Sequence, residues 1–468
     1  MHKCFLGGLK IRPKVGLEWN SYCCYVSAHQ QSTGSDTMSK YLCLVSLLLA
    51  VAMVNSKFEQ LSSKTRYKDV FTKNIVLPPG YKPSKALLLI RHATCTPDES
   101  VYNNMMVLLR ELQEKIRTTG KKPVGKDVQI FLDWTATPYQ FVEGAYLLPE
   151  GIMEITQFAT RLKDTLPKFF DGLYDAAKYP IKAIPSGRAI ETSRVFLKTL
   201  FNESSLPEEI PTCSETDLLL VFEYGRGTVD PGRKQYRKHV ERQRKDFIKS
   251  RAFTNVRQKF ANKFGLHVEE VDYGYIKSLW DICRWNRLIY SEDQCPCHFF
   301  EEEDIGVMLK LDEDRWWSFS STSVSLFNGK LSCGIFDHLL RFLKSKKKRP
   351  LFPMYFGHRT NVLLAHTALG LDPVKENFST SHVIPFMANL MVIVFQKKGT
   401  ESLVGFYFNE TLTAIPLVDN STYCDYCRLS DVIIKLDAYL VLNECEKFFS
   451  EAEDKSVGVP YDFSRPSY

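Results

Sequence analysis

Three short segments of the chain end in basic or imidazole side chains directly before a helix-start pattern. An apolar run ends in Arg91-His92, a second ends in Pro185-Ser186-Gly187-Arg188, and a third leads into Gly357-His358-Arg359-Thr360. Guanidinium and imidazole groups at a helix N-terminus favour an anion, because the free backbone N–H groups and the helix dipole attract negative charge. Three such junctions on one sheet would converge on a phosphate.

Each junction is predicted to join a buried strand to a helix. Ala86–Ile90 is an apolar run of buried-strand type, and Thr96-Pro97-Asp98-Glu99 combines an N-cap threonine, a first-turn proline and a capping-box glutamate. Ser186 is the predicted N-cap of a second helix, and the third helix closes at Gly370. In open α/β sheets ligands bind at the carboxyl ends of strands. A plain strand–loop–helix joint with a surface histidine is the alternative for the first junction.

The segment RHATCTP at 91–97 resembles the RHGxRxP signature of the histidine acid phosphatases. The chain is most similar to the multiple inositol polyphosphate phosphatases, whose segment reads RHGTRYP, from about residue 75 to about residue 450. Each similar segment is weak alone, and their order and spacing make the resemblance specific. The others are PSGRAIETS at 185–193, Cys283…Cys297-His-Phe-Phe-Glu-Glu-Glu-Asp, MYFGH at 354–358 and VIPFMANLMVIVF at 383–395.

The expected fold is α/β, a doubly wound, mostly parallel sheet flanked by helices, with an inserted and mainly helical cap domain. The predicted α/β domain comprises residues 75–212 and 345–450, the helical insertion is 213–344, and 451–468 is a loose tail. A hydrophobic content of 44% over about 410 residues after the predicted leader is enough to bury a large core.

The resemblance implies phosphomonoester hydrolysis in two steps. His92 would attack phosphorus and form a phosphohistidine that water then hydrolyses. Arg91, Arg188 and His358 would hold the phosphoryl oxygens, with Thr94 and Arg359 as further substrate-binding residues. The scheme needs neither a metal ion nor a cofactor.

Three positions depart from the family pattern. Ala93 replaces a glycine, Cys95 replaces the second arginine, and Thr360 stands where relatives carry the carboxyl group that protonates the leaving alkoxide. Loss of a general acid typically lowers a rate by about 10²–10⁴. Loss of a charge partner of the transition state removes a further factor of about 10²–10³.

Compensation for these losses is a hypothesis with two parts. Arg359 would swing into the space vacated at position 95, and Asp98 or Glu99 would lend a proton. The plainer interpretation makes Glu99 a capping residue and Asp98 a solvated acid at the helix start. Three functions stay open: an active phosphatase with an altered acid step, a catalytically silent protein that binds anions or inositol phosphates, and a secreted structural protein without a ligand.

The cysteines indicate an oxidising compartment. Nine follow the predicted leader, and setting Cys95 aside leaves eight, enough for four disulfides. The resemblance suggests a Cys283–Cys297 pair, and Cys424 and Cys427 are close enough in sequence for a local pair. Cys95 does not fit the loop of the cysteine phosphatases, because residue 101 is Val where an arginine is required. Zinc binding by Cys295, Cys297 and His298 is the alternative to pairing.

The leader and the sequons agree with that compartment. Residues 38–56 read as a signal peptide with a short apolar core, and residues 1–37 as an extension or a start codon set too far upstream. A signal anchor is the alternative, and no second apolar run is long enough to span a membrane. The expected location is therefore extracellular or the lumen of the endoplasmic reticulum. Predicted glycosylation sites are Asn202, Asn377, Asn409 and Asn420.

The net charge of +7 is placed unevenly. Basic side chains concentrate in residues 233–251, at the start of the predicted insertion, and again in residues 344–349. Solvated surface is the plain interpretation, although the first segment would lie near a polyphosphorylated substrate if the cap covers the site. Nucleic-acid binding is disfavoured, because no aromatic residues are interleaved with the charges and the compartment is wrong.

Overall fold

The three strand-to-helix junctions lie on a sheet at the centre of the fold. The computed structural model describes residues 61–71, 75–120, 125–135, 147–213, 232–290, 296–320, 329–346, 349, 351–371, 379–419 and 421–455. These belong to one compact unit, Gln60–Tyr468. The predicted signal peptide, the segment before it and the sequons at Asn377 and Asn420 lie outside the described residues.

A seven-stranded sheet runs in the order β2-β3-β1-β4-β5-β6, with β9 also paired to β5. β2, β3 and β1 are parallel, whereas β4, β5, β6 and β9 join in antiparallel pairs. The expected mostly parallel sheet is therefore correct for β2-β3-β1 only, and the sheet is mixed. The strands are β1 (Lys82–Arg91), β2 (Ile181–Ala183), β3 (Met354–Gly357), β4 (Asn389–Gln396), β5 (Leu403–Phe408), β6 (Thr411–Leu412) and β9 (Tyr426–Arg428), with a separate pair β7 (Ile415–Pro416) and β8 (Tyr423–Cys424).

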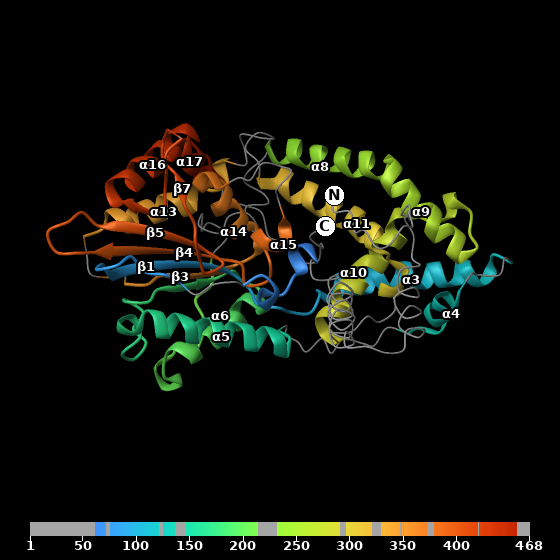
Figure 1. Cartoon of the computed structure of the whole chain (residues 1–468), viewed down its shortest axis with the longest axis horizontal. Coiled ribbons are helices and arrows are strands. Elements are labelled where there is room, and N and C mark those ends of the chain that lie inside the picture. Colours follow the sequence, from blue (N-terminus) through green and yellow to red (C-terminus); the bar gives the residue numbers. More distant parts are fainter. Residues whose placement is uncertain are drawn as a thin grey trace, which may run out of the picture. The chain divides into compact units, whose positions relative to one another are not determined.

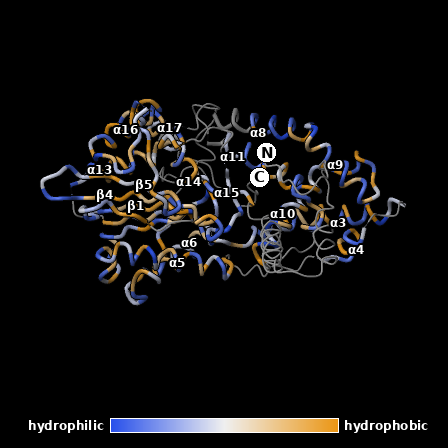
Figure 2. The backbone as a smooth tube through the Cα atoms, viewed as in Figure 1, coloured by the Kyte–Doolittle hydropathy of each residue, from blue (hydrophilic) through white to orange (hydrophobic). Residues whose placement is uncertain are grey.

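Helices cover both faces of this sheet (Figure 1). α5 (Pro149–Thr165) and α6 (Gly187–Leu200) lie against one face, and α13 (Cys333–Lys344) and α16 (Leu429–Leu442) against the other. Because both faces are covered, the central strands are continuous apolar runs, which Figure 2 shows in orange. Leu88, Leu89 and Ile90 of β1 are fully buried.

A second group of helices packs away from the sheet (Figure 1). α3 packs against α10, and Phe131 of α4 stacks on Phe264 of α9 and meets Phe299 edge-on. α3 and α4 thus pack with the predicted insertion although they precede it, while α13, from within the predicted insertion, packs on α16. The group comprises α3 (Glu99–Thr118), α4 (Lys126–Asp133), α8 (Gly232–Lys249), α9 (Arg251–Phe264), α10 (Tyr273–Tyr290) and α11 (Glu302–Ser320).

The remaining helices and turns are shorter. α14 (Arg359–His366) follows β3 and continues into a π-helical turn, η9 (Thr367–Leu371), in which Gly370 has a positive φ of 78° and ends the helix as predicted. α15 (Thr380–Val383) precedes β4, and α17 (Cys445–Lys455) follows α16. The 3₁₀ turns are η2 (Ser62–Lys64), η3 (Tyr67–Asp69), η4 (Pro167–Phe169), η5 (Glu203–Ser205), η7 (Val268–Glu270) and η8 (Cys297–Phe299).

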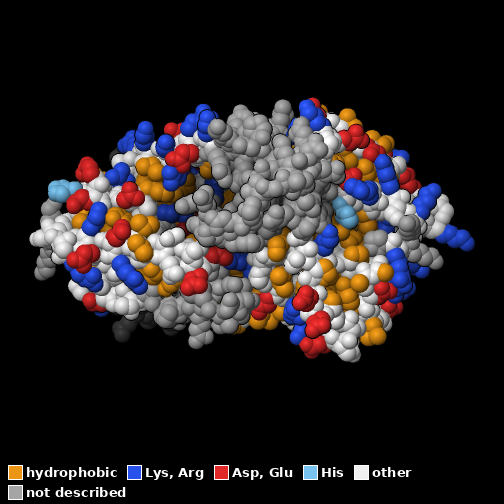
Figure 3. Space-filling model, turned by 180° about the vertical axis from the view of Figure 1, so that it is seen from behind, with side chains coloured by type: hydrophobic (Ala, Val, Ile, Leu, Met, Phe, Trp, Pro, Cys, Tyr) orange, Lys and Arg blue, Asp and Glu red, His pale blue; other side chains and the backbone are white. Residues whose placement is uncertain are grey.

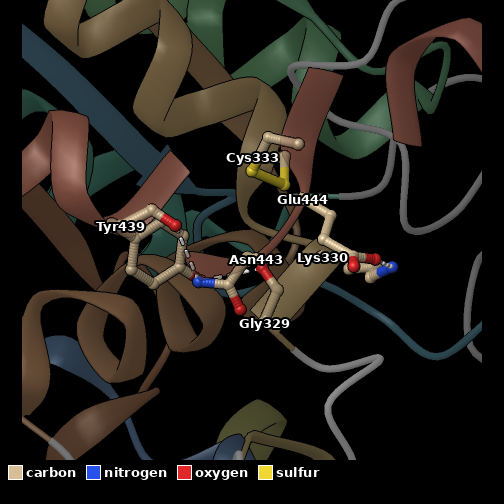
Figure 4. Close-up of a disulfide and its surroundings, with 7 residues drawn as sticks. Gly329, Lys330, Cys333, Tyr439, Asn443 and Glu444 are labelled. Atoms are coloured by element: carbon tan, nitrogen blue, oxygen red, sulfur yellow. Dashed lines mark hydrogen bonds and ion pairs between the residues drawn. A yellow bond between two sulfur atoms is a disulfide. The ribbon is translucent and has the colours of Figure 1, made fainter. Parts of the chain in front are cut away.

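Three disulfides join described residues. Cys283–Cys297 and Cys424–Cys427 confirm the two predicted pairs. The third, Cys333–Cys445, fastens α13 to α17 across 112 residues, and Figure 4 shows it beside the Lys330–Glu444 ion pair of 2.7 Å and the Tyr439 hydroxyl that donates to Gly329 O. Since Cys297 is in a disulfide, the zinc alternative is wrong. Disulfides agree with a secreted or lumenal protein.

The described surface carries both signs of charge. On the face in Figure 3, Lys and Arg side chains are interspersed with Asp and Glu. No helix within the described ranges has the length and apolar character needed to cross a bilayer. Of the two predicted glycosylation sites in this part of the chain, Asn202 is exposed. The Nδ2 atom of Asn409, which would carry the glycan, donates to His382 O at 2.7 Å.

Candidate active site

The sheet register brings the three predicted junctions to one edge. Arg91 at the end of β1 pairs with Gly357 at the end of β3, and Ala183 of β2 pairs with Phe356 of β3. The backbone N–H of His92 donates to Gly357 O at 3.0 Å. Because the three strands are parallel, their carboxyl ends coincide, as the sequence predicted.

α6 begins where the sequence predicts, whereas α14 begins two residues before the helical stretch predicted at 361–369. α6 starts after its N-cap Ser186, which puts Arg188 in the first turn. α14 starts after His358, whose backbone N–H donates to Asn361 Oδ1 at 2.9 Å.

The start predicted for α3 is wrong. This helix begins at Glu99 with Asp98 as N-cap, and Thr96 caps nothing, since its buried hydroxyl has no hydrogen-bond partner. An isolated antiparallel bridge joins Cys95 to Leu147 just before this segment, and the helix begins two residues later than predicted.

His92 is buried and held in one orientation. Its Nδ1 lies 3.0 Å from Ala93 O, and because a carbonyl can only accept, Nδ1 carries the proton and Nε2 keeps its lone pair. The ring meets His358 edge-on at 5.2 Å between centroids. Burial, followed by the positive charges of Arg91, His358 and Arg188, holds the pKa of His92 well below its usual range. A neutral imidazole with a free Nε2 is a competent nucleophile.

Arg91 is fixed by groups that the sequence did not reveal. Its Nη1 donates to Ser63 O at 2.5 Å and to Ile384 O at 2.8 Å, and the guanidinium lies 4.2 Å above the Phe386 ring. The Nε atom of Arg91 is buried without a hydrogen-bond partner. Unpaired buried donors are costly, and an anion in the site is one means of satisfying this one.

Arg359 lies beside Arg91 rather than beside Cys95. Its Nη1 contacts Ser63 Oγ at 3.4 Å, and its guanidinium stacks 4.5 Å above Trp316 of α11. The idea that Arg359 fills the space at position 95 is therefore wrong in this conformation. Ser63 contacts both arginines, Arg91 through its carbonyl oxygen and Arg359 through its hydroxyl. Nothing in the sequence around Ser63 predicts this role.

Arg188 occupies the space beside Cys95. The Cys95 sulfur lies 3.6 Å from His92 Nδ1 and 3.7 Å from Arg188 Nη1. Burial raises the pKa of Cys95, so the group stays a thiol, and it forms no disulfide, as predicted. Arg188 Nη2 in turn donates to the Asp98 carboxylate. A neutral sulfur thus separates the nucleophile from the arginine.

Thr94 faces away from the predicted substrate site, which corrects its assignment. Its hydroxyl donates to Glu154 Oε2 at 2.8 Å, and its carbonyl accepts from Leu148 N at 3.0 Å. Glu154 also accepts from Lys68 N, and burial raises the pKa of this carboxyl to about 7. Glu154 therefore holds in place the segment 92–94 after β1, the nucleophile loop, from the side of α5. The sequence did not reveal Glu154, because the packing of α5 against the loop after β1 cannot be derived from local patterns.

Thr360 offers no substitute for a general acid. Its hydroxyl is buried and has no hydrogen-bond partner. Within the described ranges no group of three or more His, Cys, Asp or Glu side chains is arranged to hold a metal ion. The site therefore combines one free imidazole nitrogen with several cations, an arrangement suited to an anion and to nucleophilic attack on phosphorus.

Comparisons with known proteins agree with this geometry. The family described as the histidine phosphatase superfamily, branch 2, matches residues 84–409. Multiple inositol polyphosphate phosphatase 1 of Drosophila melanogaster is 24% identical over 420 residues, spanning 80% of this chain and 84% of that protein.

Solved structures show the same fold. The phytase from D. castellii matches with a TM-score of 0.61 and 15% identity, over 83% of this chain and 88% of the phytase. The multiple inositol polyphosphate phosphatase of Bifidobacterium longum, in complex with inositol hexasulfate, matches with a TM-score of 0.60 and 14% identity, over 80% of this chain and 97% of that one. The chain belongs to branch 2 of the histidine phosphatase superfamily.

Proposed function

We propose that the protein is a secreted or lumenal phosphomonoester hydrolase that acts on inositol polyphosphates or similar small phosphates through a phosphohistidine at His92. The observation that carries this proposal is the His92 ring, whose Nδ1–H is bound to Ala93 O so that Nε2 is free. The names of the relatives, a multiple inositol polyphosphate phosphatase and a phytase, support the substrate class.

In the first step His92 Nε2 forms a bond to phosphorus while the bond from phosphorus to the ester oxygen breaks, and the electron pair leaves with the alkoxide. In the second step water attacks the phosphohistidine, the P–N bond breaks, and phosphate is released as His92 becomes neutral again. Arg91, Arg188 and His358 stabilise the equatorial oxygens. Burial, followed by the nearby positive charges, lowers the pKa of His92 and so favours the neutral imidazole that the attack requires.

The leaving alkoxide is the weak point of the reaction. Thr360 cannot donate a proton near neutral pH, so the proton must come from water or from another acid. Esters with good leaving groups need this proton least. We therefore expect aryl phosphates to be hydrolysed relatively faster than inositol phosphates, in comparison with relatives that carry the carboxyl group.

A catalytically silent anion-binding protein is the second candidate. Two observations favour it, namely the neutral Cys95 sulfur between His92 and Arg188 and the buried hydroxyl at Thr360. The change at Cys95 removes one cation, but Arg91, Arg188 and Arg359 remain to bind phosphate. Anion binding is therefore common to both candidates, and catalysis separates them.

The test is phosphate release from inositol hexakisphosphate and from an aryl phosphate, between about pH 4 and 7. His92→Ala is expected to abolish release, and His267→Ala, at an exposed histidine outside the site, is the matched control. Release that persists in His92→Ala would refute the phosphohistidine. No release from the wild type, together with calorimetric binding of inositol hexasulfate, would support the silent binder.

A further inference from the structure

Arg188 is already paired with an anion of the protein itself. Its Nη2 donates to Asp98, and its Nη1 lies 3.7 Å from the Cys95 sulfur. The Arg188 side chain is 12% exposed and that of Asp98 is 53% exposed, so the carboxylate lies at the more open end of the pair. A phosphate that uses Arg188 must displace this carboxylate or share the guanidinium with it.

The fold does not require the Asp98 carboxylate in this place. Asp98 is the N-cap residue of α3, yet its side chain makes no capping hydrogen bond to the helix. The neighbouring carboxylate, Glu99, is also exposed and lies in the first turn of the same helix. The pair with Arg188 is therefore the main contact of the Asp98 carboxylate, and it joins the N-terminal ends of α3 and α6.

We propose that Asp98 is an internal competitor for Arg188 that weakens the binding of phosphate in the candidate active site. This inference rests on the proposed function, since it takes the pocket to be an anion site. An intramolecular partner has a high effective concentration, and after displacement its charge still repels the phosphate nearby. Every ligand that uses Arg188 bears this cost, and inorganic phosphate, which has few other contacts to offer, is the simplest ligand on which to measure it. Asp98 thereby speeds the release of the phosphate product.

Asp98→Asn tests this proposal directly. Asparagine is isosteric and is itself a good N-cap residue, so α3 is expected to stay intact. Calorimetric titration with inorganic phosphate at low ionic strength should show binding that is tighter by roughly threefold to tenfold, since the pair is half-exposed and screened. The gain should shrink as salt is added. Glu99→Gln removes the same charge one residue away and should change the affinity much less.

A double-mutant cycle with Arg188→Ala identifies the partner. If Asp98 acts through Arg188, the gain from Asp98→Asn disappears in the Arg188→Ala background. Unchanged or weaker phosphate binding by Asp98→Asn, while the wild type binds inositol hexasulfate, would overturn the competitor and leave the anion site standing. A gain of equal size in Glu99→Gln would also overturn it. If neither the wild type nor Asp98→Asn binds either anion, the proposed function fails and the inference with it.

Discussion

Gly151→Ala should disable the site without touching any catalytic residue. Gly151 lies in the first turn of α5, and a Cβ atom there would be 2.1 Å from Thr94 O and 2.9 Å from Thr94 N. Both are backbone atoms of the nucleophile loop, so no side chain can rotate away. An ordinary contact needs about 1 Å more than the carbonyl distance allows, so α5 or the loop must move by about that amount.

The expected loss follows from where that displacement falls. Thr94 is two residues from His92, and a misplacement of about 1 Å in a reacting group can lower a rate by about 10²-fold. Overpacking of this kind also costs about 1–3 kcal/mol of stability. We expect phosphate release to fall by about two orders of magnitude, or, for a silent protein, the affinity for inositol hexasulfate to fall clearly, together with a lower Tm.

A matched helical glycine provides the control. Gly306 lies in α11, and a Cβ atom there would meet nothing within 4 Å. Gly306→Ala should leave function unchanged and raise stability slightly, because alanine favours the helix by about 1 kcal/mol over glycine. Turnover, affinity and Tm of both variants would be measured side by side. If Gly151→Ala behaves like Gly306→Ala, the close contact between α5 and the nucleophile loop does not position His92, and the reasoning is refuted.

Three further predictions concern pH, a cation and a disulfide. Burial raises the pKa of Glu154 from 4.5 to about 7, so between these values the folded protein holds a proton that the unfolded chain has lost, and stability should fall as pH rises through the window. Glu154→Gln should flatten that slope in thermal unfolding, and an unchanged slope would contradict the assignment. Arg359→Ala should weaken calorimetric binding of inositol hexasulfate by about tenfold, whereas equal affinity would remove Arg359 from the anion site. Replacing both cysteines of the Cys333–Cys445 disulfide by serine should lower the free energy of unfolding in denaturant by about 4–5 kcal/mol, because this disulfide closes a loop of 112 residues. The same change at Cys424–Cys427, which closes a loop of 3 residues, should cost less, and an equal cost would show that chain entropy is not the cause.

Local patterns in the sequence were enough to place most of the site. An apolar run followed by a cap residue predicts a strand that enters a helix, and this logic placed His92, Arg188 and His358 at the carboxyl ends of strands. It failed at α3, which begins two residues late, and it could not show the bridge of Cys95 to Leu147, two residues that are 52 positions apart in sequence. Helix-start signals cannot anticipate such a contact.

Side-chain directions in the site were not accessible in the same way. Thr94 stands between His92 and Cys95 in sequence, yet it turns to Glu154, which is 60 residues away. Arg359 was expected near Cys95 and instead contacts Ser63, which is 296 residues away. These outcomes depend on which helix lies behind the loop and which segment lies above it, and both are consequences of packing.

By itself, the sequence determined the chemical inventory: two histidines and three arginines at strand-to-helix junctions, a cysteine and a threonine where relatives carry an arginine and an acid, and the order of segments typical of the family. Only the tertiary structure decided how these groups are used. Parallel pairing of β2-β3-β1 brings their ends together, and antiparallel β4 continues the sheet beside β1. Arg188 pairs with Asp98 because the N-terminal ends of α3 and α6 meet, although the two residues are 90 positions apart. Residue types and local periodicity are written in short stretches of the chain, whereas charge pairing in a buried site depends on contacts between distant ones.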